Sequence, residues 1–231
     1  MVERIGEILD LISSLDQGAN STLKLYSMDD NSTSLKEQQF SYDIRRSILL
    51  AKYIHHWGQP SKRTVSIKEG MDGRVEVYEF PPQQNGVYRI VTIGVSCQTQ
   101  ELGATANWEL LFCLPEDLGG ANSESAVHYL LDIMAYSLRA DVGMKVGALI
   151  PESSLAPGSW STKAILIDEA RGEDEEMSSI NIFQQTVGLL WMVPLTRNEY
   201  SLIKNKGIEE FDRIESASDV SLLDVNRDGI V

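Results

Sequence analysis

The sequence predicts an α+β (mixed α/β) fold: a single domain in which a mixed β-sheet is flanked by helices. Two patterns carry this prediction, because apolar residues recur at helical spacing in some segments and alternate with polar residues in others. The helical and strand-like segments come in clusters rather than in strict alternation, which is typical of such mixed folds. At 231 residues and 42% hydrophobic content, the chain can fill a normal core.

Two helices joined by a polar loop are expected in the N-terminal part. Residues 1–15 carry apolar side chains at helical spacing, broken by charged ones, so they predict an amphipathic helix rather than a signal peptide. Residues 17–39 are rich in Ser, Asn, Asp and Thr, a composition typical of a loop. Residues 42–57 return to helical spacing, and Gly58 with Pro60 beyond it provides a helix stop.

The following part of the chain predicts a group of strands and one helix. Apolar and polar residues alternate between turns rich in Gly, Pro and Asn, over residues 64–68, 75–80, 88–95 and 108–114. A helix is expected over residues 123–139, where apolar side chains share one face and Ser123 is available as a cap.

A second group of strands and two short helices are expected in the C-terminal part. The strand-like segments lie at residues 144–150, 164–167, 180–183 and 187–193. Thr196 predicts the N-cap of a helix over residues 198–205, and Gly207 separates this helix from another over residues 208–214. Residues 221–224 are again strand-like.

The charge of the chain argues against nucleic-acid binding. There are 34 Asp and Glu residues against 20 Lys and Arg, which gives a formal net charge of -14, and the basic residues are not clustered as phosphate contacts require. An acidic surface favours fast association with a basic partner, although it can also serve solubility alone. We therefore expect no nucleic-acid partner.

The sequence places the protein in the cytoplasm. No apolar run approaches the roughly 18 residues that a membrane span needs, so we expect no membrane association. Cys97 and Cys113 both lie in predicted strands, which favours two buried, reduced thiols over a disulfide.

The histidines do not predict a catalytic or metal site. His55 and His56 are adjacent on a predicted helix and project about 100° apart, so they cannot meet one metal as an i, i+4 pair does. His128 has Asp132 four residues further on, but a solvated helix pair explains this spacing more often than a catalytic dyad. A hydrolase would need a polar cluster around one of these three histidines.

Three further patterns resemble functional motifs. Ser201 and Lys204 have the spacing used by penicillin-interacting enzymes, but the companion motifs of those enzymes are missing. Residues 224–229 match the start of a calcium-binding loop, yet the acidic ligand at the twelfth position is missing. The acidic segment 168–176 could attract a metal or a basic partner, but a solvated loop is the usual role of a charge run. The sequence thus predicts no catalytic residue, cofactor or metal.

Four short blocks follow one another in a distinctive order, at residues 92–96, 108–112, 193–199 and 224–227. Together they resemble the Suppressor of Fused (SUFU) domain family. The positions that carry the resemblance are Thr92, Gly94, Trp108, Pro194, Glu199, Gly207, Asp224 and Arg227. The likeness begins near Ile44, so we expect residues 1–40 to form an N-terminal extension of helix and polar loop, and residues 41–231 to form the SUFU-like domain.

The resemblance implies a protein-binding function without catalysis. The resemblance extends over the first domain of the animal members, so we expect the short, single-domain bacterial type, for which the resemblance implies an immunity protein that neutralises a toxin of a polymorphic toxin system. The negative charge would suit a basic toxin. An intracellular adaptor or scaffold with a constitutive partner would have the same sequence features, and a hydrolase is a third, weaker alternative.

The resemblance also suggests where a partner could bind. In the animal members a peptide adds as a strand near the region that matches residues 96–109 here, so the predicted contact residues are Ser96, Gln98, Gln100, Glu101 and Glu109. The other motif positions are expected to be structural, for example Glu199 in the first turn of a helix. Neither the partner's identity nor the oligomeric state can be read from the residues.

Overall fold

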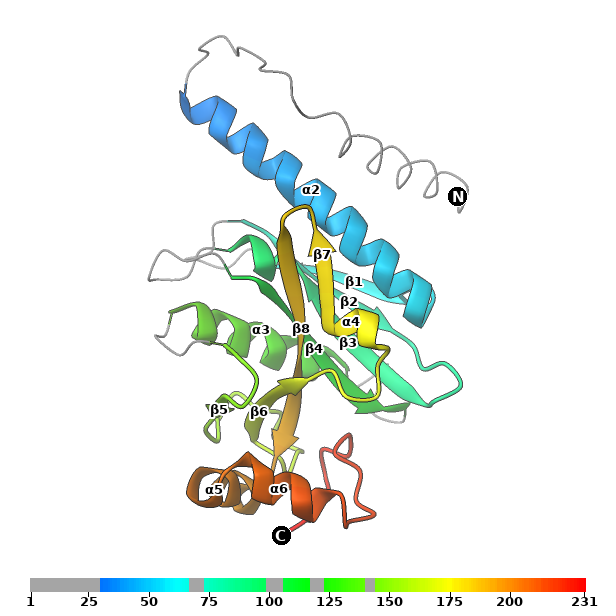
Figure 1. The fold of residues 1–231 in the computed structure, drawn as a ribbon, viewed down its shortest axis with the longest axis vertical. Coiled ribbons are helices and arrows are strands. Elements are labelled where there is room, and N and C mark those ends of the chain that lie inside the picture. Colours follow the sequence, from blue (N-terminus) through cyan, green and yellow to red (C-terminus); the bar gives the residue numbers. More distant parts are fainter. Residues whose placement is uncertain (1–29, 67–72, 99–105, 117–122, 140–143) are drawn as a thin grey trace. The chain divides into compact units, whose positions relative to one another are not determined.

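Eight strands form one mixed sheet in the part of the chain that the computed structural model describes (Figure 1). The described residues are 30–66, 73–98, 106–116, 123–139 and 144–231. The strands are β1 (Lys62–Ser66), β2 (Val75–Phe80), β3 (Val87–Ile93), β4 (Trp108–Pro115), β5 (Leu149–Ile150), β6 (Ala164–Glu169), β7 (Ser179–Ile182) and β8 (Gln185–Leu195). The helices are α2 (Asp30–Trp57), α3 (Ser123–Arg139), α4 (Glu175–Ser178), α5 (Arg197–Lys206) and α6 (Ile208–Glu215).

The strand order is β1-β2-β3-β4-β8-β6-β5, and β7 pairs with the beginning of β8. Strands β4 and β8 run parallel, with Trp108 opposite Gly188, whereas all other pairs are antiparallel. The sheet is therefore mixed, as predicted. Strand β8 connects the two halves of the sheet, because it pairs with β4 on one side and with β6 and β7 as well.

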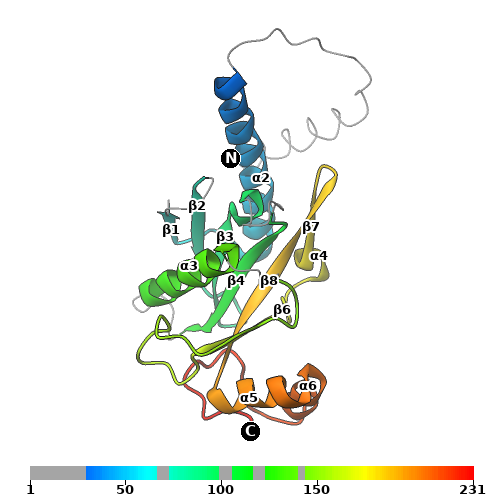
Figure 2. The same cartoon turned by 90° about the vertical axis from the view of Figure 1, so that its left-hand side faces the viewer.

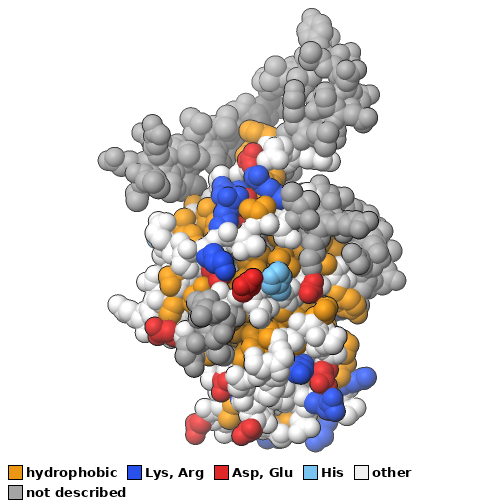
Figure 3. Space-filling model, turned by 180° about the vertical axis from the view of Figure 1, so that it is seen from behind, with side chains coloured by type: hydrophobic (Ala, Val, Ile, Leu, Met, Phe, Trp, Pro, Cys, Tyr) orange, Lys and Arg blue, Asp and Glu red, His pale blue; other side chains and the backbone are white. Residues whose placement is uncertain are grey.

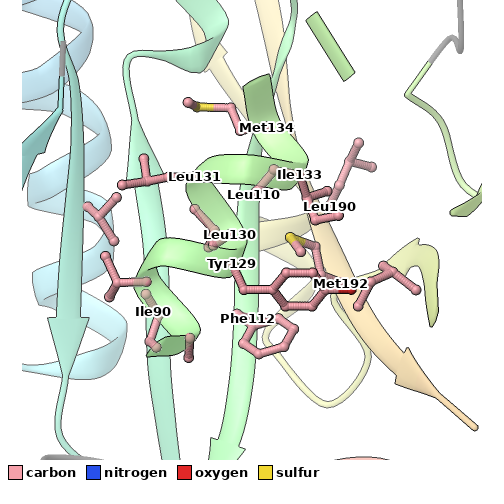
Figure 4. Close-up of a cluster of buried hydrophobic side chains, with 14 of the residues drawn as sticks. Ile90, Leu110, Phe112, Tyr129, Leu130, Leu131, Ile133, Met134, Leu190 and Met192 are labelled. Atoms are coloured by element: carbon pink, nitrogen blue, oxygen red, sulfur yellow. The ribbon is translucent and has the colours of Figure 1, made fainter. Parts of the chain in front are cut away.

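Each face of the sheet buries its own hydrophobic core. Helix α3 covers one face (Figure 2), where Tyr129 lies beside Phe112 and Met192 (Figure 4), and Leu130 and Met134 belong to the same buried cluster. The other face packs against the last turns of α2 and against α4, α5 and α6. These two layers of helices match strands that are buried on both faces, such as β2, whose six residues, two of them glutamates, are all buried.

The chain divides into two units, Met1–Ser47 and Ile48–Val231, and α2 contributes residues to both. In the first unit, only residues 30–47 are described, and they are helical. In the second unit, Tyr53 stacks on Trp57 with ring centroids 4.9 Å apart, and both contact Phe80 edge-on. These aromatic contacts hold the last turns of α2 against the sheet.

Several predicted boundaries differ from the structure. The helix predicted over residues 42–57 begins at Asp30, so residues 30–39 are not a loop; Lys36 to Gln39 are good helix formers. Residues 144–148 are not strand, because Gly147 adopts a φ of 86° in a turn, and residues 221–224 form a turn instead of a strand. The helix predicted over residues 1–15 lies outside the described residues.

None of the helices in the described ranges combines the length and the apolar composition that crossing a bilayer requires.

Candidate functional site

The first block of motif residues forms a tight turn around the buried carboxylate of Glu109. Strand β3 ends at Ile93, Gly94 adopts a φ of 109°, and the chain continues into a short 3-10 helix at Val95–Cys97. The Oε1 atom of Glu109 accepts hydrogen bonds from the backbone N–H groups of Gly94 and Ser96, both at 3.0 Å. Its Oε2 atom accepts from the Val95 N–H at 3.2 Å and from the Thr92 hydroxyl at 2.7 Å.

This arrangement, the Glu109 turn, comprises Thr92, Gly94 to Gln98 and Glu109. The Glu109 side chain has no solvent exposure, and burial raises its pKa, while the donors from Thr92, Ser96 and Gly94 oppose that rise. Gln98 closes the turn, because its side-chain amide donates to the Gly94 carbonyl at 3.1 Å and its own carbonyl accepts from the Ala106 N–H at 2.9 Å. The carboxylate therefore holds a backbone turn in place.

The structure places three of the five predicted contact residues in this turn. Ser96, Gln98 and Glu109 are all buried, so their side chains do not face solvent. Gln100 and Glu101 lie outside the described residues. Binding at this place stays a prediction, and it would use the backbone or the neighbouring residues rather than the three buried side chains.

Four of the remaining motif residues, Pro194, Glu199, Asp224 and Arg227, meet at the end of β8. Arg227 is buried and donates to the carboxylate of Glu199 twice, from Nε at 3.0 Å and from Nη2 at 2.8 Å. It also donates to the carbonyls of Pro194, Leu222 and Asp224. We call these five residues the Arg227 cluster. Motif positions far apart in the sequence thus form one hydrogen-bonded group, which the sequence analysis did not foresee.

Glu199 of the Arg227 cluster also helps to cap the start of helix α5. Thr196 is the N-cap of this helix, and Thr196 and Glu199 form a capping box. The Thr196 N–H donates to Glu199 Oε2 at 2.7 Å, and the Glu199 N–H donates to the Thr196 hydroxyl at 3.3 Å. Gly207, with a φ of 90°, ends α5 and begins α6. The predicted roles of Thr196 and Gly207 as helix boundaries are therefore confirmed, whereas the motif residue Trp108 is buried in the core that α3 covers.

The calcium-like segment has a structural role in this arrangement. The side chain of Asp224 accepts a hydrogen bond from the Asn226 N–H at 2.8 Å, and Arg227 points into the protein toward Glu199. The Val225 carbonyl accepts from the Thr162 hydroxyl at 2.8 Å, which ties the segment to the sheet. Within the described ranges, no three His, Cys, Asp or Glu side chains come together as a metal site would require.

The acidic segment 168–176 is largely used by ion pairs and hydrogen bonds within the protein. Glu173 accepts from Arg89 Nε at 2.6 Å and from the Trp57 indole N–H at 2.7 Å. Other acidic residues of the segment pair with basic ones nearby: Asp168 with Arg171, Asp174 with His56, and Glu176 with Lys52. Burial raises the pKa of Asp168, and the Arg171 guanidinium opposes that rise. The expectation of a solvated loop therefore holds only in part, because the side chains of Asp168 and Glu173 are largely buried whereas those of Asp174 and Glu176 stay exposed.

The described histidines and Ser201 take part in ordinary structural contacts. His56 pairs with Asp174, with 2.7 Å between Nδ1 and Oδ2, and His128 is exposed, with 3.9 Å between its Nε2 and Oε1 of Glu124. The Ser201 hydroxyl donates to the Arg197 carbonyl at 2.8 Å, so it bonds to the backbone of α5 rather than to the Lys204 side chain.

A cleft that the sequence did not predict lies where β4 and β8 separate. Their pairing ends at Leu111 and Trp191, and beyond it opens a space of about 420 Å³. Its lining includes Cys113, Trp191, Arg89 and Leu222. The face drawn in Figure 3 carries acidic and basic side chains scattered among hydrophobic and uncharged ones, so the net negative charge does not form a single-sign patch there.

Comparisons with known proteins find a family whose sequence model matches this chain and solved structures with a similar fold. A model of the family described as suppressor of fused protein (SUFU) matches residues 72–228. A solved structure of a SUFU homologue from Neisseria gonorrhoeae FA 1090 is similar with a TM-score of 0.64 and 16% identity, covering 82% of this chain and 97% of that one. No curated protein matches the chain in sequence.

Two further solved structures share the fold. A chain of the Sufu–Fu complex crystal structure is similar with a TM-score of 0.57 and 15% identity, over 80% of this chain and 91% of that one. Drosophila Suppressor of Fused has a TM-score of 0.56 and 17% identity, over 79% of this chain but only 49% of its own. Because the family model begins at residue 72, the predicted domain boundary after residue 40 stays a prediction.

Proposed function

This chain belongs to the suppressor of fused family, and from that premise we propose that it is a non-enzymatic protein-binding domain. One observation carries the proposal: six of the eight motif residues belong to two buried structures, the Glu109 turn and the Arg227 cluster. Both oxygens of Glu109 accept hydrogen bonds from donors of the same chain, so this carboxylate is occupied rather than poised for general base catalysis. Such motifs maintain a scaffold.

The finer proposal is that the protein is an immunity protein that neutralises a cognate toxin by binding it directly. An inhibitor of this kind needs only a complementary surface that covers the toxin. The net charge of -14 supports a basic toxin, because long-range attraction between opposite charges speeds association. Cys97 and Cys113 are not joined in a disulfide, which fits a reducing compartment such as the cytoplasm.

The segment that leaves the Glu109 turn is the proposed contact region, with Gln100 and Glu101 as its contact residues. The turn supports this proposal because it holds the backbone at Gln98 through two hydrogen bonds.

An adaptor with a constitutive partner is the alternative. The Sufu–Fu complex supports it, because there a protein of similar fold is found with another protein. An adaptor and an immunity protein differ in what they bind, not in fold, so only the identity of the partner separates them.

The test is purification of the tagged full chain from its native cells, followed by identification of the proteins that co-purify. The immunity proposal predicts one stoichiometric toxin, whose activity is abolished when the purified chain is added and whose association slows as salt is raised. A stoichiometric housekeeping protein would favour the adaptor. If no protein co-purifies at low salt, protein binding as the function is contradicted.

A further inference from the structure

The turn between β7 and β8 places an aromatic side chain in an unfavourable backbone conformation. Ile182 pairs with Gln185, so Phe183 and Gln184 form a two-residue connection. Phe183 has a φ of 55° and is the one non-glycine residue with positive φ among those the structure describes. Glycine or asparagine is the usual choice in this region, and a bulky residue there is an outlier. Such strain often marks a functional position.

The side chain of Phe183 gains no burial in return for this conformation. It is 68% exposed, as much as any large hydrophobic residue in the described part of the chain. Its neighbours Ile180, Ile182 and Val187 are buried and anchor the hairpin to the sheet, so the exposure of Phe183 does not come from loose packing.

The surroundings of Phe183 are polar but uncharged. No charged residue occurs between residues 177 and 196, in a chain of which 23% is charged. Asn181, Gln184, Gln185 and Thr186 are exposed around the ring. Binding sites between proteins typically have this composition, with an aromatic residue at the centre, few charges and a polar rim.

The hairpin also carries a side-chain hydrogen bond between its strands and lies at a sheet edge. The Thr186 hydroxyl donates to the Asn181 side chain at 2.9 Å across the two strands. In the described residues β7 pairs only with β8, and it carries none of the Lys or Pro residues that commonly protect an edge strand. A tip constrained by the hydrogen bond between Thr186 and Asn181 loses less entropy on binding.

We propose that the β7–β8 turn is a further contact of the protein-binding surface, in addition to the segment after the Glu109 turn, with Phe183 as its anchor. The partner it fits is a protein with an uncharged, apolar recess that receives the phenyl ring, surrounded by groups that hydrogen-bond to Asn181, Gln184 and Gln185. This inference rests on the proposed protein-binding function and adds the site at which the partner is held. The acidic residues elsewhere speed the approach, whereas Phe183 slows dissociation.

The test uses the partner identified by co-purification, purified and titrated by calorimetry against the full chain. Phe183→Gly removes the ring and relieves the positive φ, so the variant should unfold at the same temperature as the wild type or higher. We expect its affinity for the partner to fall at least tenfold, at low and high salt alike. Phe183→Tyr keeps an aromatic ring and should retain most of the affinity.

Leu155→Ala is the matched control, because Leu155 is 54% exposed and lies on a loop outside the hairpin. The affinity of the Leu155→Ala variant for the partner should remain within twofold of the wild-type affinity. The inference is overturned if Phe183→Gly is folded and binds as tightly as the wild type, a result that leaves the protein-binding function standing. If the wild type itself binds no protein, the proposed function and the inference fail together.

Discussion

Arg227 and Glu199 form an ion pair that is closed to solvent on both sides: the exposed fraction is 4% for the arginine and 0% for the glutamate. The guanidinium donates two hydrogen bonds to the carboxylate and others to the carbonyls of Pro194, Leu222 and Asp224. The carboxylate in turn accepts from the N–H groups of Thr196 and Ile230. Buried charges with this many partners are costly to separate.

Replacing Arg227 by Met should lower the free energy of unfolding by about 3–5 kcal/mol, because Glu199 would keep a buried charge without its partner. Urea unfolding followed by circular dichroism measures the loss. The double variant with Glu199→Gln should lose less than the sum of the two single losses. Arg213→Met, which removes a solvent-screened surface pair with Glu210, should leave the free energy of unfolding nearly unchanged. Equal losses at Arg227 and Arg213 would contradict the structural role of the cluster.

Glu109→Gln should destabilise the protein by about 2–3 kcal/mol, because glutamine offers one acceptor oxygen and its amide would face N–H donors. The control is Glu124→Gln, at a side chain that is 80% exposed, which should be nearly neutral. Thermal unfolding of the two variants compares them directly. A neutral effect at Glu109 would mean that the turn holds its shape without the carboxylate.

Gly229→Ala should destabilise the segment that carries Arg227, by about 1–3 kcal/mol. Gly229 has a φ of 96°, and an added Cβ would lie 3.0 Å from the hydroxyl of Thr196, the N-cap of α5. Gly158→Ala is the control, since Gly158 has no positive φ and open space around its Cα. The control should be neutral or slightly stabilising. Chemical denaturation of both variants decides, and equal stabilities would refute the expected strain.

Cys97 should react with iodoacetamide at least tenfold faster than Cys113 in the folded protein. Cys113 is buried, and burial raises its pKa, so less thiolate is present at neutral pH, whereas Cys97 is only partly buried. Mass spectrometry of the labelled peptides measures both rates, and in urea the two should become similar. A disulfide between them, or equal reactivity in the folded state, would contradict the structure.

Local patterns predicted many of the elements correctly. The helix expected over residues 123–139 is α3, and the strand expected over residues 75–80 is β2, with the same bounds in both cases. The spacing of apolar residues within a short segment indicates a helix or a strand, so these elements can be predicted without knowing the fold. The prediction was wrong at residues 144–148 and 221–224, where turns override apolar composition.

The relationships that build the candidate site could not be read in this way. Glu109 and Arg227 look like ordinary charged residues in the sequence, and each is buried by partners from other segments: Thr92 and Gly94 for the first, Pro194 and Glu199 for the second. Which segments meet depends on the order of the strands, above all on the parallel pairing of β4 with β8. The family resemblance indicated that these positions matter, but their roles required the structure.

The place of β8 in the sheet has a consequence for how the chain is made. Its parallel pairing with β4 places Trp108 opposite Gly188. Strand β4 therefore has only β3 as a neighbour until the residues of β8 have been synthesised. Closing so long a loop costs entropy before any contact is gained, which makes refolding slow. During synthesis, the unpaired edge of β4 can associate with other chains. We therefore expect the yield of native protein to depend on translation speed and on chaperones more than its final stability suggests.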